Sequence, residues 1–282
     1  MKIFPDGFTI AAVAPAGAPA PGVVDSGAAV LRRLGAEVKL MPSVYGRPGK
    51  LPFLAADDEL RLADLQNAMD DPDVALIWAV RGGYGSARLL EQLKWPNHSR
   101  RFMLGGFSDI TALHWAMSAS GAGRVLALPM FSFLTEMDEL TRFHLAALFS
   151  GREQRLTLPA LRPGDLNARP LAGNLTVAAS LCGTRYFPDT TGRIVILEEI
   201  GEAPYRIDRL LFQLRCSGTF DRCAGVLFGR FTDCGPQEKI MAVLEDFTAR
   251  VNCPVFYGLE YGHECPFISM DCGRELRVSS RR

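Results

Sequence analysis

The sequence predicts an α/β protein with an N-terminal parallel-sheet domain of the Rossmann-like or flavodoxin-like kind and a smaller C-terminal α/β domain. Short apolar runs alternate with helical patterns along the first half, which is typical of βαβ units with right-handed crossovers. The 282 residues, 48% of them hydrophobic, suffice for one large core or two smaller ones. The regular spacing of apolar residues is interrupted near the middle of the chain, and this interruption favours two domains.

In the first half of the sequence, turn-forming residues flank each apolar run. The strand expected over Phe8–Ala14 ends at Pro15-Ala16-Gly17, and Gly35 stops the helix that follows. After that first strand, the elements expected in this half are a helix over Val23–Leu34, a strand around Val38, a helix over Asp57–Met69 and a strand over Val74–Val80.

The segment Gly151–Asn167 lacks apolar periodicity and contains Pro159 and Pro163, so we expect a linker here. The predicted boundaries are 1–150 for the N-terminal domain, 151–168 for the linker and 169–282 for the C-terminal domain. The elements expected after the linker are a helix over Leu175–Cys182, a strand over Ile194–Leu197, a helix over Tyr205–Arg215, a strand over Gly225–Phe228, a helix over Glu238–Arg250 and a strand over Pro254–Leu259.

Charge and cysteine content exclude several classes of function. Thirty-one basic residues balance thirty-one acidic ones, and no Lys/Arg-rich run offers a footprint for nucleic acid. Seven cysteines without a C-x-x-C pair favour reduced thiols over a disulfide framework. The sequence contains no secretory signal and no apolar stretch long enough to span a bilayer, so we expect a cytoplasmic protein without a membrane partner.

The stretch Leu104–Thr111 indicates chemistry most directly. Gly105-Gly106 ends an apolar run and an amphipathic run begins at Ile110, which predicts Ser108 at a strand-to-helix turn beside free backbone N–H groups. Such a hydroxyl is a candidate nucleophile, and the N–H of Asp109 is a candidate oxyanion donor. Because Ile110 stands where the motif G-x-S-x-G has its last glycine, an ordinary βα connection is the alternative.

A glycine-rich loop, Arg81-Gly82-Gly83-Tyr84-Gly85, follows the strand expected over Val74–Val80, and a helix from Ala87 to Leu93 is expected after it. Open α/β sheets bind ligands at the carboxyl ends of their strands. The spacing matches neither G-x-G-x-x-G nor a P-loop, which disfavours nucleotide phosphate. Two interpretations stay open. The glycines only permit a tight turn, or Gly82 or Gly83 presents a backbone N–H to an anionic oxygen.

A serine nucleophile needs a base, and the chain has four histidines. His98 is expected in a polar loop, facing water. His114 follows the serine by six residues on the same helix and projects away from the turn, and His144 lies in an apolar helical run. His263 stands in a glycine-flanked turn at a strand end and is the candidate base, against the alternative of a loop histidine without a role.

Two adjacent carboxylates, Glu198 and Glu199, end the strand expected over Ile194–Leu197. Burying a carboxylate without a partner is costly, and alternation sends the two to opposite faces, so only one can point towards His263. Glu198 is the candidate that holds the imidazole tautomer and stabilises the imidazolium. A zinc site from His263, Glu264 and Cys265 would need ligands at incompatible neighbouring positions, so we expect no metal and no cofactor.

Five segments together resemble the LD-carboxypeptidase family of serine peptidases, in the family's order and over nearly the whole chain. The family's serine maps onto Ser108, its glutamate onto Glu198 and its histidine onto His263. The segments are Ala79–Gly85, Gly105–Thr111, Leu197–Glu199, Tyr205–Arg209 and Gly258–His263.

The resemblance implies hydrolysis of the L,D peptide bond that joins the terminal D-alanine to the third residue of a murein tetrapeptide, in cytoplasmic murein recycling. It also implies an acyl-enzyme on the serine, an active site in the cleft between the two domains, a small peptide as substrate and a homodimer. Within this scheme Asp109 and either Gly82 or Gly83 hold the oxyanion. The candidate substrate-binding residues are Arg81, Tyr84, Arg206 and Arg230.

Two departures from the family pattern stand outside the triad. Ala16 occupies a position where serine is usual in the first turn, and Ser269–Gly273 replaces a more apolar segment after the histidine. Both can alter the cleft.

Two other functions stay open at this point. The first is an immunity-type amidase of the same family that cleaves aminoacyl-nucleotide antibiotics. The absence of Phe, Tyr and Trp from Gly151–Arg185 disfavours it, because a nucleobase usually needs an aromatic platform. The second is a non-catalytic module whose glycine loops bind a small anion. The occurrence of serine, glutamate and histidine together at strand ends argues against that module.

Overall fold

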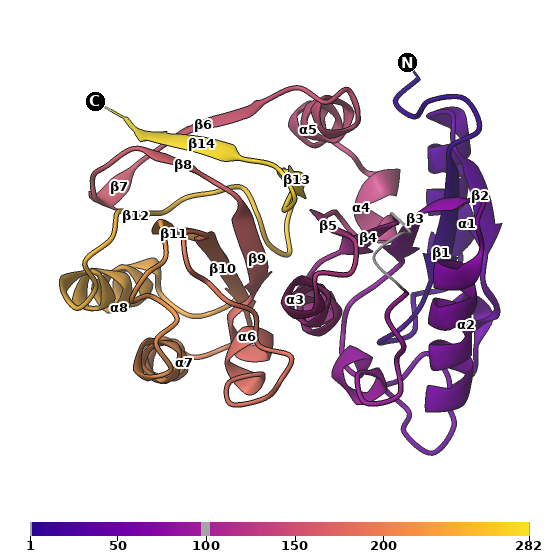
Figure 1. Cartoon of the computed structure of the whole chain (residues 1–282), viewed down its shortest axis with the longest axis horizontal. Coiled ribbons are helices and arrows are strands. Elements are labelled where there is room, and N and C mark those ends of the chain that lie inside the picture. The colour runs from indigo at the N-terminus through magenta and orange to yellow at the C-terminus, as the bar shows by residue number, and fades with distance from the viewer. Residues whose placement is uncertain (1, 97–101, 282) are drawn as a thin grey trace.

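Two mainly parallel sheets and one small sheet organise the chain, which a computed structural model describes over residues 2–96 and 102–281 (Figure 1). In Figure 1 the N-terminal half, from indigo to magenta, lies on one side, and the C-terminal half, from orange to yellow, lies on the other. This arrangement confirms the predicted α/β class. In the described part of the chain, no helix has the length and apolar character that crossing a membrane requires. His98 lies outside the described residues.

The N-terminal sheet has the strand order β13-β5-β4-β3-β1-β2, in which β1 to β5 are parallel and β13 is antiparallel. Read from β2 to β5, the order 2-1-3-4-5 is that of a flavodoxin-like sheet, in which ligands bind at the carboxyl ends near β1 and β3. The strands are β1 (Thr9–Val13), β2 (Glu37–Leu40), β3 (Val74–Ala79), β4 (Met103–Gly106), β5 (Arg124–Ala127) and β13 (Met270–Asp271).

The helices of this half follow the expected pattern with one exception. The helix predicted from Ala87 to Leu93 is only a short 3₁₀ turn over Ser86–Leu89, which Gly85 precedes in a left-handed conformation and which ends in irregular turns over residues 90–92. The helical elements are α1 (Val23–Arg33), η1 (Pro42–Tyr45), α2 (Asp58–Asp70), η2 (Ser86–Leu89), η3 (Ser108–Ile110), α3 (Thr111–Ser120), α4 (Phe131–Thr135) and α5 (Glu139–Phe149).

The C-terminal sheet has the order β7-β12-β11-β10-β9, in which β9 to β12 are parallel and β7 is antiparallel to β12. Strand β10 extends three residues beyond the prediction, so Glu198 and Glu199 lie within it. Strand β12 is shorter than predicted. The elements are β7 (Ala160–Arg162), β9 (Pro170–Asn174), α6 (Leu175–Ser180), β10 (Ile194–Ile200), α7 (Pro204–Cys216), β11 (Gly225–Thr232), α8 (Gln237–Ala249) and β12 (Val255–Phe256).

The segment 151–168, predicted as a linker, contains three strands. These are β6 (Gln154–Leu158), β7 and β8 (Leu166–Ala168). Strands β6 and β8 flank β14 (Leu276–Ser280) in the small sheet, and β7 extends the C-terminal sheet. Their partners lie roughly a hundred residues further along the chain, so local composition carries no sign of the pairing. The domain boundaries proposed from the sequence remain predictions, and this segment pairs with strands of the C-terminal half.

The chain after residue 269 returns to the N-terminal sheet. Strand β13 pairs with β5, and there the Arg124 guanidinium holds the Asp271 carboxylate with two contacts, one of them at 2.7 Å. Figure 1 shows this yellow strand beside the magenta β5. The segment that contains the candidate base is therefore tied at its far end to the sheet that carries the candidate nucleophile.

Helix α3 supplies a second tie between the two halves. The Trp115 indole donates to the carbonyl of Ala172 at 3.1 Å, and the Thr111 hydroxyl accepts from the backbone N–H of Asn174 at 2.8 Å. Only glycine fits at position 173, because a Cβ there would lie 2.6 Å from Thr111 Cγ2 and 2.9 Å from the Trp115 indole nitrogen. The helix that follows Ser108 is thus locked onto β9, the neighbour of β10.

Candidate active site

Ser108 occupies a strained turn at the carboxyl end of β4. Its φ of 63° lies in the left-handed region, which a non-glycine residue adopts at a cost of about 1–3 kcal/mol and which is found most often at functional sites. Ile110, the departure from the elbow motif, packs over Gly106, where a Cβ would lie 3.0 Å from the isoleucine Cγ2. The missing last glycine of the motif is therefore compatible with the sharp turn at Ser108.

Ser108, His263 and Glu198 form a continuous chain of hydrogen bonds. Ser108 Oγ lies 2.9 Å from His263 Nε2, and His263 Nδ1 lies 2.9 Å from Glu198 Oε2. The three residues come from the turn after β4, the loop after β12 and strand β10. The structure therefore brings together the three side chains that the sequence analysis selected, at distances suited to proton transfer.

Burial governs the electrostatics of these three hydrogen-bonded side chains. The Glu198 side chain is fully buried, and this burial raises the pKa of its carboxyl group, whereas the hydrogen bond with His263 opposes the rise. Position 229 on the adjacent strand must be glycine, because a Cβ there would lie 2.4 Å from the Tyr261 carbonyl oxygen. Residues 257–269 form the loop that carries His263, called the histidine loop below. Its close approach to β11 keeps Glu198 away from water.

Glu199 points to the opposite face and performs a different task. Its carboxylate accepts hydrogen bonds from the Asn174 side chain at 2.9 Å, from the Thr176 backbone at 2.8 Å and from the Ile200 backbone at 2.9 Å. It thereby fixes β10 to the start of α6. The alternation predicted from the sequence separates one carboxylate that contacts the histidine from one that ties two elements together.

Two of the other histidines, His114 and His144, are unsuited to act as the base. Burial lowers the pKa of His114 to about 3, since its ring lies inside the packing of α3. Burial also lowers the pKa of His144 on α5. The His263 ring instead packs at 4.9 Å from the Phe107 ring and remains slightly exposed. Phe107 was not singled out from the sequence, although it directly precedes the serine.

The glycine loop lies directly against the nucleophile. A Cβ on Gly82 would lie 3.0 Å from Ser108 Oγ and 3.3 Å from the backbone nitrogen of Asp109. The Gly17 N–H donates to the Gly82 carbonyl at 3.0 Å, and Ser86 bonds both the carboxylate and the carbonyl of Asp109, at 2.9 and 2.6 Å. The space that a side chain would fill is thus left open beside the hydroxyl.

A buried arginine that the sequence analysis missed supports this loop. The Arg61 side chain is fully buried and donates to the carbonyls of Gly85 at 3.0 Å, of Ala56 at 3.1 Å and of Pro15. It also pairs with the carboxylate of Asp58. Its contacts join the turn after β1 to the glycine loop after β3. A single arginine inside a helical sequence pattern carries no local sign of such a role.

The four candidate substrate-binding residues lie in three different places. Arg81 and Tyr84 are exposed on the glycine loop, where Arg81 donates to the carbonyl of Ala18 and Tyr84 packs edge-on against the exposed Phe53 ring at 5.3 Å. Arg206 pairs with Glu202 at 3.1 Å on the surface of α7, and no contact joins it to the hydrogen-bonded chain among the described residues. Arg230 lies against the histidine loop.

A metal has no evident site in the described ranges. No group of three or more His, Cys, Asp or Glu side chains is arranged there to hold an ion. Glu264, beside the candidate base, is turned towards Arg230 instead. The groups that the structure brings together at Ser108 are a hydroxyl, an imidazole and a carboxylate.

Comparisons with known proteins agree over most of the chain. Residues 10–126 match the LD-carboxypeptidase N-terminal domain model, and residues 167–278 match the C-terminal domain model of the same family. The chain is 32% identical to the murein tetrapeptide carboxypeptidase of Pseudomonas aeruginosa, over 90% of this chain and 87% of that protein.

Solved structures agree in fold. The muramoyltetrapeptide carboxypeptidase of Oxalobacter formigenes has a TM-score of 0.83 and 27% identity, over 97% of this chain and 95% of that chain. An MccF-like protein from Bacillus anthracis has a TM-score of 0.87 at 20% identity, over 100% and 96% of the two chains, and this likeness concerns the fold alone.

The two adjacent glutamates can be separated by experiment. We expect Glu198→Gln to slow the labelling of Ser108 by a fluorophosphonate at least about 100-fold, because a neutral amide no longer stabilises the imidazolium. We expect Glu199→Gln to label at nearly the normal rate but to lose about 2 kcal/mol of unfolding free energy, since buried N–H donors lose a charged acceptor. Labelling rates and urea unfolding curves of both variants decide the matter. The reverse pattern would mean that the assignment of the two carboxylates is wrong.

Proposed function

This chain belongs to the LD-carboxypeptidase family, and from that premise we propose that it is a serine peptidase that releases the terminal D-alanine of murein tetrapeptides. Ser108 is the nucleophile, His263 the base and Glu198 the residue that orients the imidazole. The observation that carries the proposal is the pair of 2.9 Å hydrogen bonds that joins these three side chains across the two halves of the chain.

The geometry supports a two-step reaction. His263 Nε2 accepts the Ser108 proton as Oγ attacks the scissile carbonyl, and the fully buried Glu198 stabilises the positive charge that develops on the ring. The imidazolium then returns the proton to the amine of the departing D-alanine. The acyl-enzyme on Ser108 is hydrolysed when the same imidazole activates a water molecule.

Backbone N–H groups near Ser108 stabilise the oxyanion in this mechanism. Asp109 supplies one donor, and Gly82 or Gly83 supplies the other. The support is the position of Gly82, whose absent side chain leaves space beside both Ser108 Oγ and the Asp109 nitrogen. Donors aimed at developing charge in a site shielded from water are worth about 10²–10³ in rate each.

The terminal carboxylate of the substrate needs a cation close to the scissile bond. Arg81 is exposed on the glycine loop, directly before Gly82, and its side chain has one backbone carbonyl as acceptor among the described residues. Its planar guanidinium is suited to a carboxylate. The exposed Tyr84 and Phe53 rings, in edge-to-face contact beside this loop, offer apolar surface to the rest of the peptide.

We propose cytoplasmic recycling of cell-wall peptides, which the family resemblance supports. All seven cysteines, every one of them in the described ranges, are free thiols, as a reducing compartment would keep them. The resemblance is also the support for a homodimer.

The substrate itself provides the most direct test. We expect release of free D-alanine from a murein tetrapeptide, and we expect amidation of the terminal carboxylate to lower kcat/KM at least about tenfold, since hydrogen bonds to charged groups are worth roughly 1.5–3 kcal/mol. A terminal L-alanine should be at least as damaging, because inversion moves the carboxylate out of register with the oxyanion donors. The assay measures free alanine by chromatography.

The controls of this assay are Ser108→Ala, which should abolish release, and an aminoacyl-nucleotide offered in place of the peptide. Equal turnover of acid, amide and L-epimer would contradict an exacting carboxypeptidase. Cleavage of the aminoacyl-nucleotide alone would favour the immunity-type amidase.

The oxyanion site can be tested by filling it. Gly82→Ala places a methyl group 2.9 Å from Ser108 Cβ, where substrate oxygen has to enter, so we expect kcat to fall at least about 100-fold, as for loss of an oxyanion donor. Gly192→Ala is the matched control, because its methyl would meet no atom within 4 Å and because Gly192 precedes β10, at the opposite end of that strand from Glu198. Steady-state rates and melting temperatures of both variants are compared. Similar losses of activity in the two would refute the role of Gly82.

A further inference from the structure

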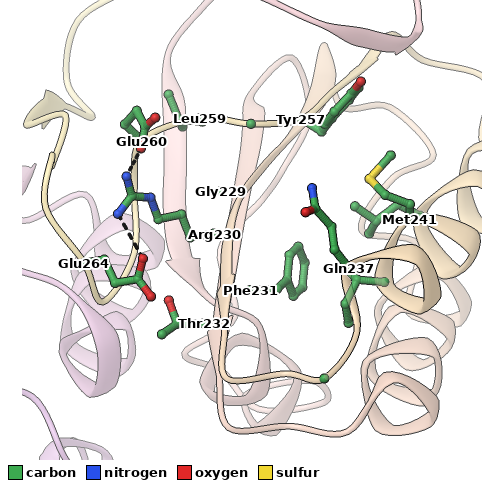
Figure 2. Close-up of a pocket in the computed structure, with 14 residues that line it drawn as sticks. Gly229, Arg230, Phe231, Thr232, Gln237, Met241, Tyr257, Leu259, Glu260 and Glu264 are labelled. Carbon is green, nitrogen blue, oxygen red and sulfur yellow. Dashed lines mark hydrogen bonds and ion pairs between the residues drawn. The ribbon is translucent and has the colours of Figure 1, made fainter.

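The guanidinium of Arg230 is already engaged by the loop that carries His263. It pairs with Glu260, lies 3.4 Å from a Glu264 carboxylate oxygen and donates to the Cys265 carbonyl at 3.0 Å. Figure 2 shows the guanidinium between the two glutamates, with both interactions drawn. The three acceptors bracket His263 in the sequence. A side chain that already has two carboxylates and a carbonyl as partners has little capacity left for the carboxylate of a substrate.

The backbone of Arg230 holds the same loop. Its N–H donates to the Tyr261 carbonyl at 2.9 Å. At Gly262, whose φ is 154°, a Cβ would lie 2.9 Å from Arg230 Cβ and 3.6 Å from the Glu198 carboxylate oxygen that bonds the histidine. Arg230 therefore contacts the residues before and after His263 through its backbone and its guanidinium, one strand away from Glu198.

Other backbone hydrogen bonds hold the two ends of this loop, from Leu259 to the Phe228 carbonyl and from Ile268 to the Glu260 carbonyl. Within the described residues, however, Arg230 is the partner of both the Glu260 and the Glu264 carboxylate on the side of β11. Residues 257–269 form no helix or strand. Glu260 and Glu264 line a cavity of about 420 Å³ between the end of β11, α8 and the segment after β12, so this side has open space instead of packed side chains. Figure 2 shows Phe231, Gln237, Met241 and Tyr257 around the remainder of this cavity. On the other side, the His263 ring rests on Phe107.

We propose that Arg230 is a positioning residue for His263 and does not bind the substrate carboxylate. It holds the loop so that the imidazole stays within 2.9 Å of both Ser108 and Glu198. This inference rests on the proposed function only in taking His263 as the base. A displacement of about 1 Å in such a group can cost about 100-fold in rate. Arginine is better suited than lysine to this position, because its planar fork reaches several acceptors at once, whereas lysine presents a single ammonium.

The first test separates rate from binding. We expect Arg230→Ala to lower kcat for D-alanine release about 100-fold with KM nearly unchanged, as for a base displaced by about 1 Å. Arg230→Lys should recover part of the loss, since it restores the charge but not all three contacts. Arg250→Ala, which removes an arginine that pairs with Asp246 on the surface of α8, is the control and should keep the normal kcat.

The second test separates positioning from substrate recognition. The ratio of kcat/KM for the free-acid tetrapeptide to that for its terminal amide is measured in the wild-type protein and in Arg230→Ala. Positioning predicts the same ratio in both, because both substrates lose rate equally. If Arg230 binds the carboxylate, the ratio falls towards one in the variant, and the proposal is overturned.

A third measurement does not depend on the substrate. The rate at which a fluorophosphonate labels Ser108 should fall in Arg230→Ala even if the tetrapeptide is not turned over, so a failure of the proposed function can be told apart from a failure of this inference. The double variant Glu260→Gln, Glu264→Gln keeps Arg230 and should slow labelling in the same direction, which covers the case in which Arg230→Ala does not fold. Normal labelling in a folded Arg230→Ala protein would overturn the proposal.

Discussion

The hydrogen bond between Ser108 and His263 joins two halves of the chain that reach the site from separate sheets. Its length depends on how those sheets are packed, since the serine follows β4 and the histidine follows β12. Helix α3 packs on β9, and β13 pairs with β5, so the same segments that flank the nucleophile and the base also cross the interface. Fold stability and the geometry of the site are therefore coupled at this contact.

Local strain at the serine is tolerated because its surroundings hold it from several sides. The left-handed φ of Ser108 would relax in an isolated turn, at a gain of roughly 1–3 kcal/mol. The backbone N–H and the hydroxyl of Ser86 donate hydrogen bonds to the Asp109 carboxylate and carbonyl. Gly82 lies so close to Ser108 that a Cβ on it would be 2.9 Å from the serine Cβ. The buried Arg61 in turn fixes the loop that carries Gly82 and Ser86. Rigid support of this kind keeps reacting groups in position without reorganisation during the reaction.

Features with a local signature could be predicted from the sequence. The glycines before Ser108 indicated a sharp turn, strand alternation separated Glu198 from Glu199, and the apolar runs indicated a parallel sheet. Features made by distant pairing could not be predicted. The strands of segment 151–168 and strand β13 acquire their partners from remote parts of the chain. Arg61 and Arg230 belong to the same class, because the carbonyls and carboxylates that they hold converge only in the folded protein.

In the proposed mechanism, Ser108 becomes covalently acylated through a triad assembled across the interface. Rapid-quench mass spectrometry of the intact protein mixed with a murein tetrapeptide tests it most directly. We expect an adduct on Ser108 whose mass corresponds to the substrate without its D-alanine, formed as D-alanine is released and absent from His263→Ala. Turnover that proceeds without any adduct and persists in a Ser108→Ala protein would contradict it.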